Sequence, residues 1–262
     1  MAQHAPPARG ARLGRAAGAN GPESMVSGVV LLLPGASRIA PGPMRPLARA
    51  LGRAGGAEGL VAHAVLHGPG DREAAARWAA DEALRRYGDV PVCLAGYGAG
   101  GRAALRAAGH AAVNSVVALA PCLPDEVRGG SPEPVKQLAG RQVLIVHGTN
   151  DARSDPECSF LLAARAKKAN RSTCRFEVHS DGHGLREHRA EVVALAVDFV
   201  LGAMVSGRYS RPVTDALAAP PPLGLRMPLA SGFGRSLRGG GAAAAKGGAR
   251  RSPRRERAPR VE

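Results

Sequence analysis

Apolar positions along the middle of the chain gather in short continuous blocks that are separated by turn residues. The segment Gly28–Leu33 (GVVLLL) is apolar throughout and ends at a Pro-Gly pair, which is typical of a strand buried on both faces of a sheet. The same pattern predicts further strands at 60–66, 90–95, 113–120, 142–146 and 174–179.

The segments between these blocks predict helices. Apolar residues at helical spacing, or good helix formers bounded by caps and glycines, mark 44–51, 71–87, 101–108, 156–168 and 187–204. Asp155 directly before Pro156 is a typical helix start. Strands that alternate with helices indicate an α/β fold with a doubly wound, mostly parallel sheet, which we assign to a domain at residues 25–207. In such sheets the site lies beyond the carboxyl ends of the strands.

The composition changes at both ends of the chain. Residues 1–24 are rich in Ala, Gly, Pro and Arg without a period, and residues 208–262 run through Pro-rich and Gly/Ala-rich stretches to an Arg-rich end. We therefore predict disordered N- and C-terminal arms. Met25 stands directly before the first strand, and the sequence leaves open whether translation starts there.

The net charge of +15 comes from 36 basic and 21 acidic residues, and +9 of it falls in the predicted tail at 208–262. A nearly neutral core with a basic tail differs from a basic nucleic-acid-binding domain, and 3% aromatic residues are too few for stacking on bases. The tail could bind nucleic acid or another polyanion, but we favour a solvated low-complexity segment.

No apolar run approaches the roughly 18 residues of a membrane span, and the N-terminus has no apolar signal region. We expect a cytoplasmic protein without a membrane partner. The four cysteines, Cys93, Cys122, Cys158 and Cys174, form no CxxC pair, so we interpret them as buried, reduced thiols.

Four loops that follow predicted strands carry the residues able to do chemistry, at 33–37, 96–102, 147–151 and 180–184. Together they resemble the α/β-hydrolase family over about residues 28–203, and they are most similar to the small lidless α/β hydrolases of actinobacteria. The family's G-x-S-x-G turn between strand and helix, the nucleophile elbow, matches Gly96-Tyr97-Gly98-Ala99-Gly100. Its HGxxD loop supplies Asp151 as the acid, and its DGH loop supplies His183 as the base.

The resemblance implies a serine hydrolase of small acyl substrates, acting as an esterase or thioesterase through an acyl-enzyme. It also implies an oxyanion hole made by the backbone N–H groups of Ala99 and of Gly35 or Ala36. The connection at 121–141 is too short for a lid domain, which predicts an open site for small substrates.

The nucleophile position, however, is occupied by Gly98, which has no side chain to attack a carbonyl. Ser115 at the start of a strand, Ser37 in the first loop and Cys93 within a strand are not placed to replace it. We therefore predict a hydrolase that is inactive or very weak, with an Asp151–His183 pair that still fixes the histidine tautomer.

Two other functions stay open. One is a non-catalytic protein that binds a small ligand in the vacated pocket. The other is an NAD(P)-binding domain through Gly96-x-Gly98-x-x-Gly101, although the next strand closes in Ala120-Pro121-Cys122 without the acidic residue that such a site uses.

One stretch is rich in possible metal ligands, His179, Asp181, His183, Glu187 and His188. The hydrolase resemblance already explains His183, so we predict neither a metal nor another cofactor.

Overall fold

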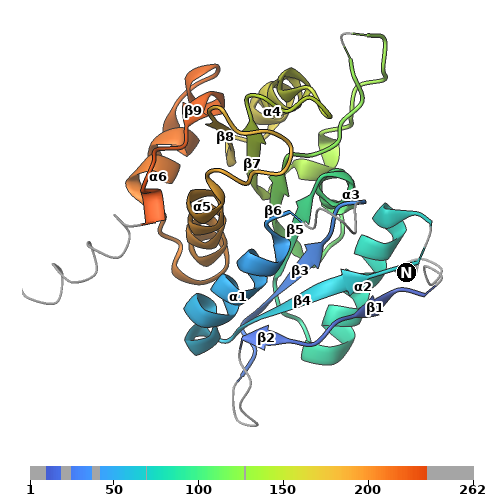
Figure 1. Ribbon diagram of the computed structural model, residues 1–262. Coiled ribbons are helices and arrows are strands. Elements are labelled where there is room, and N and C mark those ends of the chain that lie inside the picture. Colours follow the sequence, from blue (N-terminus) through green and yellow to red (C-terminus); the bar gives the residue numbers. More distant parts are fainter. Residues whose placement is uncertain (1–9, 19–24, 37–41, 69, 127, 235–262) are drawn as a thin grey trace, which may run out of the picture.

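The computed structural model describes residues 10–18, 25–36, 42–68, 70–126 and 128–234. These form one mostly parallel sheet in the order β1-β4-β3-β5-β6-β7-β8-β9, with β2 also paired to β4 (Figure 1). The strands are β1 Arg12–Leu13, β2 Ala17–Gly18, β3 Gly28–Leu33, β4 Leu60–Leu66, β5 Val92–Tyr97, β6 Val113–Leu119, β7 Gln142–Gly148, β8 Thr173–Val178 and β9 Met227–Pro228.

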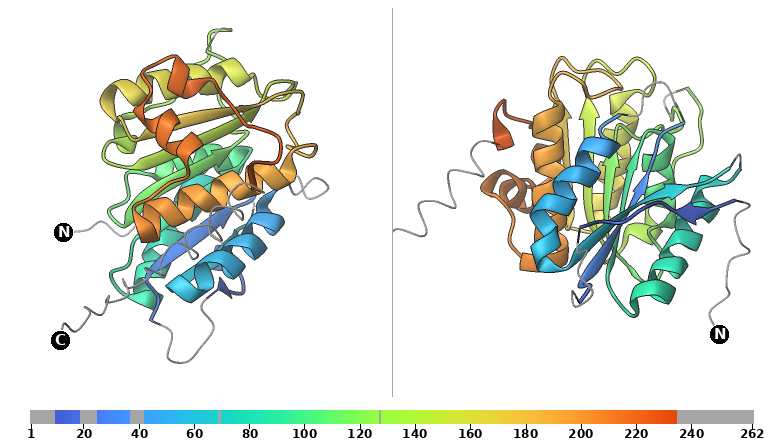
Figure 2. Two further views of the ribbon diagram at one scale, coloured as in Figure 1. Left: turned by 90° about the vertical axis from the view of Figure 1, so that its left-hand side faces the viewer. Right: turned by 60° about the horizontal axis from the view of Figure 1, so that its bottom comes forward.

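Helices cover both faces of the sheet. They are α1 Met44–Gly55, α2 Arg72–Tyr87, α3 Ala99–Ala107, α4 Pro156–Ala169, α5 Arg189–Leu201 and α6 Arg211–Ala218. Helices α1, α5 and α6 share one apolar core with the sheet, and α2, α3 and α4 share the other, so the two sets lie on opposite faces (Figure 2). The predicted doubly wound α/β fold is confirmed.

The parallel register brings the functional loops to one edge of the sheet. Leu33 at the end of β3 pairs with Gly96, Tyr97 at the end of β5 pairs with Leu119, and Gly148 at the end of β7 pairs with Val178. Because the strands end level with one another, the loops that follow β3, β5, β6, β7 and β8 converge. The predicted helix start at 156 is also present, since the Asp155 side chain accepts a hydrogen bond from the backbone N–H of Glu157.

The ordered chain extends past both limits of the predicted domain. Residues 12–13 and 17–18 form β1 and β2, which pair antiparallel with β4, so the prediction of disorder over 1–24 is wrong there. Short strands without a hydrophobic period gave no signal, because their order comes from backbone pairing with a neighbour. Residues 1–9 and 19–24 lie outside the described residues.

Residues 208–234 are ordered as well, which corrects the predicted tail at 208–262. They form α6, a 3-10 turn and β9, which pairs with β8, and they bury Val213, Leu225 and Phe233. Val213, Ala216 and Leu217 stand at helical spacing within α6, but a pattern this short does not outweigh the Pro- and Gly-rich composition around it. Residues 235–262 lie outside the described residues.

A buried lysine ties this C-terminal segment to the sheet. The Lys167 ammonium on α4 donates hydrogen bonds to the carbonyl oxygens of Thr173, Ala216 and Leu217 at 2.9–3.1 Å. Burial lowers the pKa of Lys167, and the three carbonyls compensate for its lost hydration. Two of the three acceptors belong to α6, so the helix supplies part of the lysine's solvation.

In the described part of the chain, no single helix is long and apolar enough to cross a membrane; only Arg189–Ser206 and Arg211–Ala218, bent by 79° relative to each other, pass that test jointly by length and composition.

We expect a chain that ends after Gly207 to be less stable than one that ends after Gly234, by at least about 3 kcal/mol. The shorter chain leaves Lys167 without two of its acceptors, and it loses five buried apolar side chains, those of Val213, Ala216, Leu225, Leu229 and Phe233. Urea unfolding of the two chains measures the difference, since they differ only in residues 208–234. Equal midpoints would show that this segment does not support the core.

Candidate active site

Three of the predicted site positions meet at the carboxyl edge of the sheet. Gly98 follows β5, Asp151 follows β7 and His183 follows β8. His183 Nδ1 lies 2.7 Å from Asp151 Oδ2. A Cβ atom built on Gly98 would lie 3.4 Å from His183 Nε2, on the opposite side of the imidazole from the carboxylate. The three positions therefore lie in the spatial order Gly98, His183, Asp151, which is the order that the resemblance implies for nucleophile position, base and acid.

The turn that holds Gly98 is set by close backbone contacts. Gly98 has φ 58° and ψ −121°, and α3 begins directly after it. A Cβ on Gly96 would lie 2.1 Å from the carbonyl oxygen of Gly100, and a Cβ on Gly100 would lie 2.2 Å from that of Leu33. Residues 96 and 100 must therefore be glycine, as in an elbow, whereas position 98 has room for a side chain. This packing accounts for the glycines, and the dinucleotide-site hypothesis built on them stays a prediction.

The Asp151 carboxylate is fully buried and is the centre of the site's hydrogen bonds. Its Oδ1 accepts from the backbone N–H groups of Arg153 at 2.8 Å and Ser154 at 3.1 Å, and its Oδ2 faces both His147 and His183. Burial by itself would raise the pKa of Asp151, but the hydrogen bonds from the two imidazoles and the backbone outweigh it and hold the pKa below its usual value. The carboxylate is therefore ionised at neutral pH.

His147, the first residue of the HGxxD match, orients that carboxylate from the side away from His183. Its Nε2 lies 3.0 Å from Asp151 Oδ2 and 3.1 Å from the Ser154 carbonyl oxygen, so Nε2 carries the proton. Its Nδ1 lies 2.9 Å from Ser159 Oγ, and this hydroxyl donates to the Pro156 carbonyl oxygen at 2.8 Å and accepts from Arg175 Nε. Burial lowers the pKa of His147, which is consistent with a neutral ring. The sequence analysis did not assign this role, although the motif contained the residue.

Of the two histidines that contact Asp151, His183 is the protonated one. Hydrogen bonds to Asp151 and then to Cys122 raise the pKa of His183 to about 9, against the effect of burial. The ring also packs against Tyr97, with 5.3 Å between the ring centroids, and 13% of the side chain is exposed. Its Nδ1–H faces the carboxylate, so Nε2 is the atom available for proton transfer.

Tyr97, within the elbow, forms one wall of the site. A Cβ on Gly35 would lie 2.9 Å from Tyr97 Cδ1, so the loop after β3 passes directly over the ring. Ala99 is the first residue of α3, and the first N–H groups of a helix have no acceptor within it. Gly35, Ala36 and Ala99 thus lie around the same turn, and their oxyanion role stays a prediction.

The cysteine prediction needs one correction. Cys93, Cys158 and Cys174 are buried and unpaired as expected, but Cys122 is only partly buried and its Sγ lies 4.0 Å from His183 Nε2. A missing CxxC motif argues only against a metal or disulfide, so it could not reveal a thiol beside the base. The sequence did contain one indication: Cys122 follows the predicted strand at 113–120, and the other functional loops also follow strands at that edge of the sheet.

Ser115 and Cys93, the alternative nucleophiles that the structure describes, lie within strands, as the sequence analysis expected. Ser115 is fully buried within β6, and burial raises the pKa of Cys93 to about 12. Ser37 lies outside the described residues.

The donor-rich stretch after β8 does not gather into a metal cage. Asp181 instead accepts hydrogen bonds from the backbone N–H groups of Gly182, Arg186 and His188, which shape the loop that presents His183. Among the described residues, no group of three His, Cys, Asp or Glu side chains could hold a metal ion.

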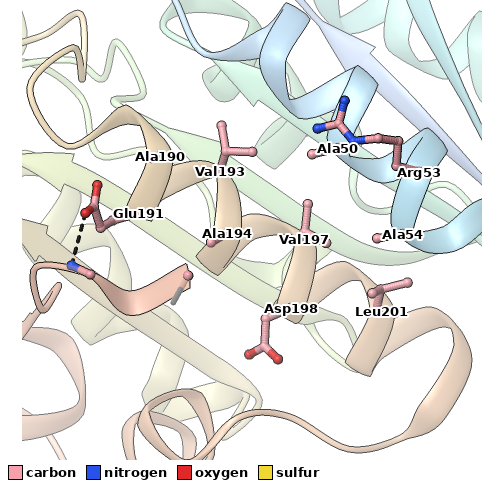
Figure 3. Close-up of a pocket in the computed structure, with 12 residues that line it drawn as sticks. Ala50, Arg53, Ala54, Ala190, Glu191, Val193, Ala194, Val197, Asp198 and Leu201 are labelled. Carbon is pink, nitrogen blue, oxygen red and sulfur yellow. Dashed lines mark hydrogen bonds between the residues drawn. The ribbon is translucent and has the colours of Figure 1, made fainter. Parts of the chain in front are cut away.

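A separate groove of about 790 Å³ lies between α1 and α5 (Figure 3). Its walls include Arg53 on α1 and Val193 and Val197 on α5, and it reaches Gly232 near the end of the described chain. None of the residues around the Asp151–His183 pair lines it, so the groove and the candidate active site are different places.

Solved structures similar to this chain are esterases and α/β serine hydrolases. Est1E from Butyrivibrio proteoclasticus matches with a TM-score of 0.59 at 14% identity, over 75% of this chain and 100% of that one. The Pyrococcus furiosus esterase Pf2001 matches at 0.58 and 15% identity, over 70% and 83%. Esterase 2 of Thermogutta terrifontis, in a structure phosphorylated by paraoxon, matches at 0.54 and 18% identity, over 79% and 100%. No family model and no curated protein matches the sequence. The fold is therefore α/β-hydrolase-like, and at these identities the likeness concerns the fold alone.

We expect the free energy of unfolding to fall as pH rises from about 6.5 to about 9. The pKa of His183 is raised in the folded state, so its contribution is complete below the unfolded pKa and disappears above the folded one, by up to about 3 kcal/mol. Urea titrations of wild type and His183→Gln at several pH values test this, because other titrating groups contribute to both. Parallel profiles for the two proteins would contradict it.

We expect Gly100→Ala to cost about 3 kcal/mol or more, because its Cβ would overlap the Leu33 carbonyl oxygen. Gly98→Ala should cost only about 1–2 kcal/mol, the strain of a positive φ, since the nearest atom to its Cβ is 3.4 Å away. Thermal unfolding of both variants compares them. A larger loss for Gly98→Ala would mean that position 98 cannot hold a side chain.

Proposed function

We propose that this protein is an esterase-like hydrolase in which the serine acyl-enzyme route is closed, while the acid–base pair of the site is retained. Its substrates or ligands are small acyl compounds, and turnover by the wild type is weak or absent. The observation that supports the proposal most directly is the position of Gly98: its Cβ site lies 3.4 Å from Nε2 of a histidine whose Nδ1 is hydrogen-bonded to a buried carboxylate.

The retained groups have a defined chemistry. Asp151 fixes the tautomer of His183 and stabilises its protonated form, which is the role of the acid in a catalytic triad. In its neutral form, His183 can take a proton through Nε2 from water or from another nucleophile nearby. Backbone N–H groups at the start of α3 have no acceptor within the helix, and in this proposal they stabilise the charge that develops on the carbonyl oxygen. Because the pKa of His183 is about 9, only a minor fraction is neutral near pH 7, which keeps base catalysis slow.

The missing hydroxyl should therefore be the principal defect. We expect Gly98→Ser to raise the hydrolysis of p-nitrophenyl acetate and butyrate by about 10²-fold or more over the wild type, because the new hydroxyl faces His183 Nε2. A fluorophosphonate probe should label residue 98 of the Gly98→Ser variant, mapped by mass spectrometry, and should not label position 98 of the wild type.

Gly98→Ala is the matched control, since it carries the same backbone strain and Cβ without a hydroxyl, and we expect no gain from it. If Gly98→Ser folds but neither hydrolyses the esters nor takes the probe, the retained pair is not competent for acyl transfer. A non-catalytic ligand-binding protein then becomes the better interpretation.

A further inference from the structure

The volume left by the missing side chain of residue 98 is bordered by a thiol. Cys122 Sγ lies 3.6 Å from the position that a Cβ on Gly98 would occupy, and 4.0 Å from His183 Nε2. His183 Nδ1 lies 2.7 Å from Asp151 Oδ2. Cys122, His183 and Asp151 thus have the relative positions of a nucleophile, a base and the group that orients the base. The sulfur comes from the loop after β6 and not from the elbow.

We propose that Cys122 is the nucleophile of this site and that it takes up acyl groups from activated small esters or thioesters. The inference rests on the proposed function, because it uses the same base and acid.

The backbone holds the sulfur in register with both neighbouring loops. The Cys122 N–H donates to the Gly98 carbonyl oxygen at 3.1 Å, which ties the thiol to the elbow. The Ser154 hydroxyl donates to the Pro121 carbonyl oxygen at 2.8 Å, while the Ser154 backbone N–H donates to Asp151 Oδ1. The segment that carries the thiol is therefore fixed to the turn and to the loop of the acid, as a preorganised nucleophile must be.

The other three thiols have no such setting. Cys93 and Cys174 are fully buried, and burial raises the pKa of each to about 12. Cys158 is 1% exposed, and burial raises its pKa as well. Of the four cysteines, Cys122 is the one that is partly exposed and within reach of an imidazole.

The reaction then proceeds in two balanced steps. In the minor fraction of the protein in which His183 is neutral, its Nε2 takes the thiol proton, the sulfur attacks the ester carbonyl and forms a C–S bond, and the carbonyl electron pair moves to the oxygen. Collapse of this adduct breaks the ester C–O bond, and the leaving alkoxide takes the proton from His183. Water attacks the thioester in the second step, His183 takes its proton, and the cleaved C–S bond returns the sulfur as a thiolate, which is reprotonated.

Acyl capture by the full-length wild type tests the proposal. The protein is mixed with p-nitrophenyl acetate, p-nitrophenol release is followed from the first milliseconds, and acid-quenched samples are mapped by mass spectrometry. We expect a burst of one equivalent of p-nitrophenol, followed by slow turnover, and one acetyl group on Cys122 that neutral hydroxylamine removes. Cys122→Ala should abolish the burst. His183→Gln should slow acetylation of the thiol by about 10²-fold or more, because the base is lost.

Cys158→Ala is the matched control, since it removes a thiol that makes no contact with His183, and it should keep the burst. Mapping acetyl groups on the wild type needs no variant, so the proposal can be overturned even if a variant fails to fold. Absence of acetyl from wild-type Cys122, a burst that survives in Cys122→Ala, or acetylation that is as fast in folded His183→Gln as in wild type each overturns it.

The doubly substituted protein Gly98→Ser, Cys122→Ala separates this inference from the proposed function. If it hydrolyses the ester while wild-type Cys122 takes no acetyl group, the retained pair works and the thiol is not its nucleophile. If it is inactive while wild-type Cys122 is acetylated with the expected dependence on His183, the thiol route stands and the serine-type geometry is wrong.

Discussion

The close approach of two backbones at the end of β5 is the constraint on which the rest of the site depends. A Cβ on Gly100 would lie 2.2 Å from the Leu33 carbonyl oxygen, so α3 can begin where it does only because residue 100 has no side chain. This contact sets the direction of α3 and presents its first N–H groups at the edge where the strands end. Residue 98, two positions earlier, has φ 58°, and its Cβ site lies 3.4 Å from His183 Nε2. The turn therefore brings the start of α3 and position 98 to the same edge of the sheet.

A second constraint is electrostatic and centres on Asp151. Burying a carboxylate is unfavourable unless its hydration is replaced, and here two backbone N–H groups and two imidazoles replace it. The two histidines differ because their surroundings differ. His147 is enclosed and held neutral by burial, whereas His183 is partly exposed and is held protonated by the same carboxylate. Asp151 thus contacts a neutral, buried histidine, His147, on one side and a titratable histidine, His183, on the other.

The fold and the acid–base pair could be predicted because both depend on local patterns. Continuous apolar strands imply a covered parallel sheet, and the loops after β5, β7 and β8 carry short motifs in a fixed chain order. What could not be predicted depends on contacts between distant segments. Val213 and Phe233 lie in a segment rich in Pro and Gly, and only packing in the core shared with α5 and the sheet buries them. Cys122 belongs to no motif, and only the pairing of β5 with β6 places its sulfur beside residue 98.

A glycine at position 98 also has a favourable energetic side. A non-glycine residue with φ near 58° carries about 1–2 kcal/mol of backbone strain, and an active serine must be held there by the surrounding structure. A glycine at this position avoids that strain and has no side chain that could react. A nucleophile placed on the end of β6 avoids the strain as well, because Cys122 reaches the same imidazole from a segment that the backbone already ties to the elbow. On this argument, a glycine at the elbow does not by itself prevent acyl transfer, because the proposed nucleophile, Cys122, lies in the loop after the neighbouring strand β6.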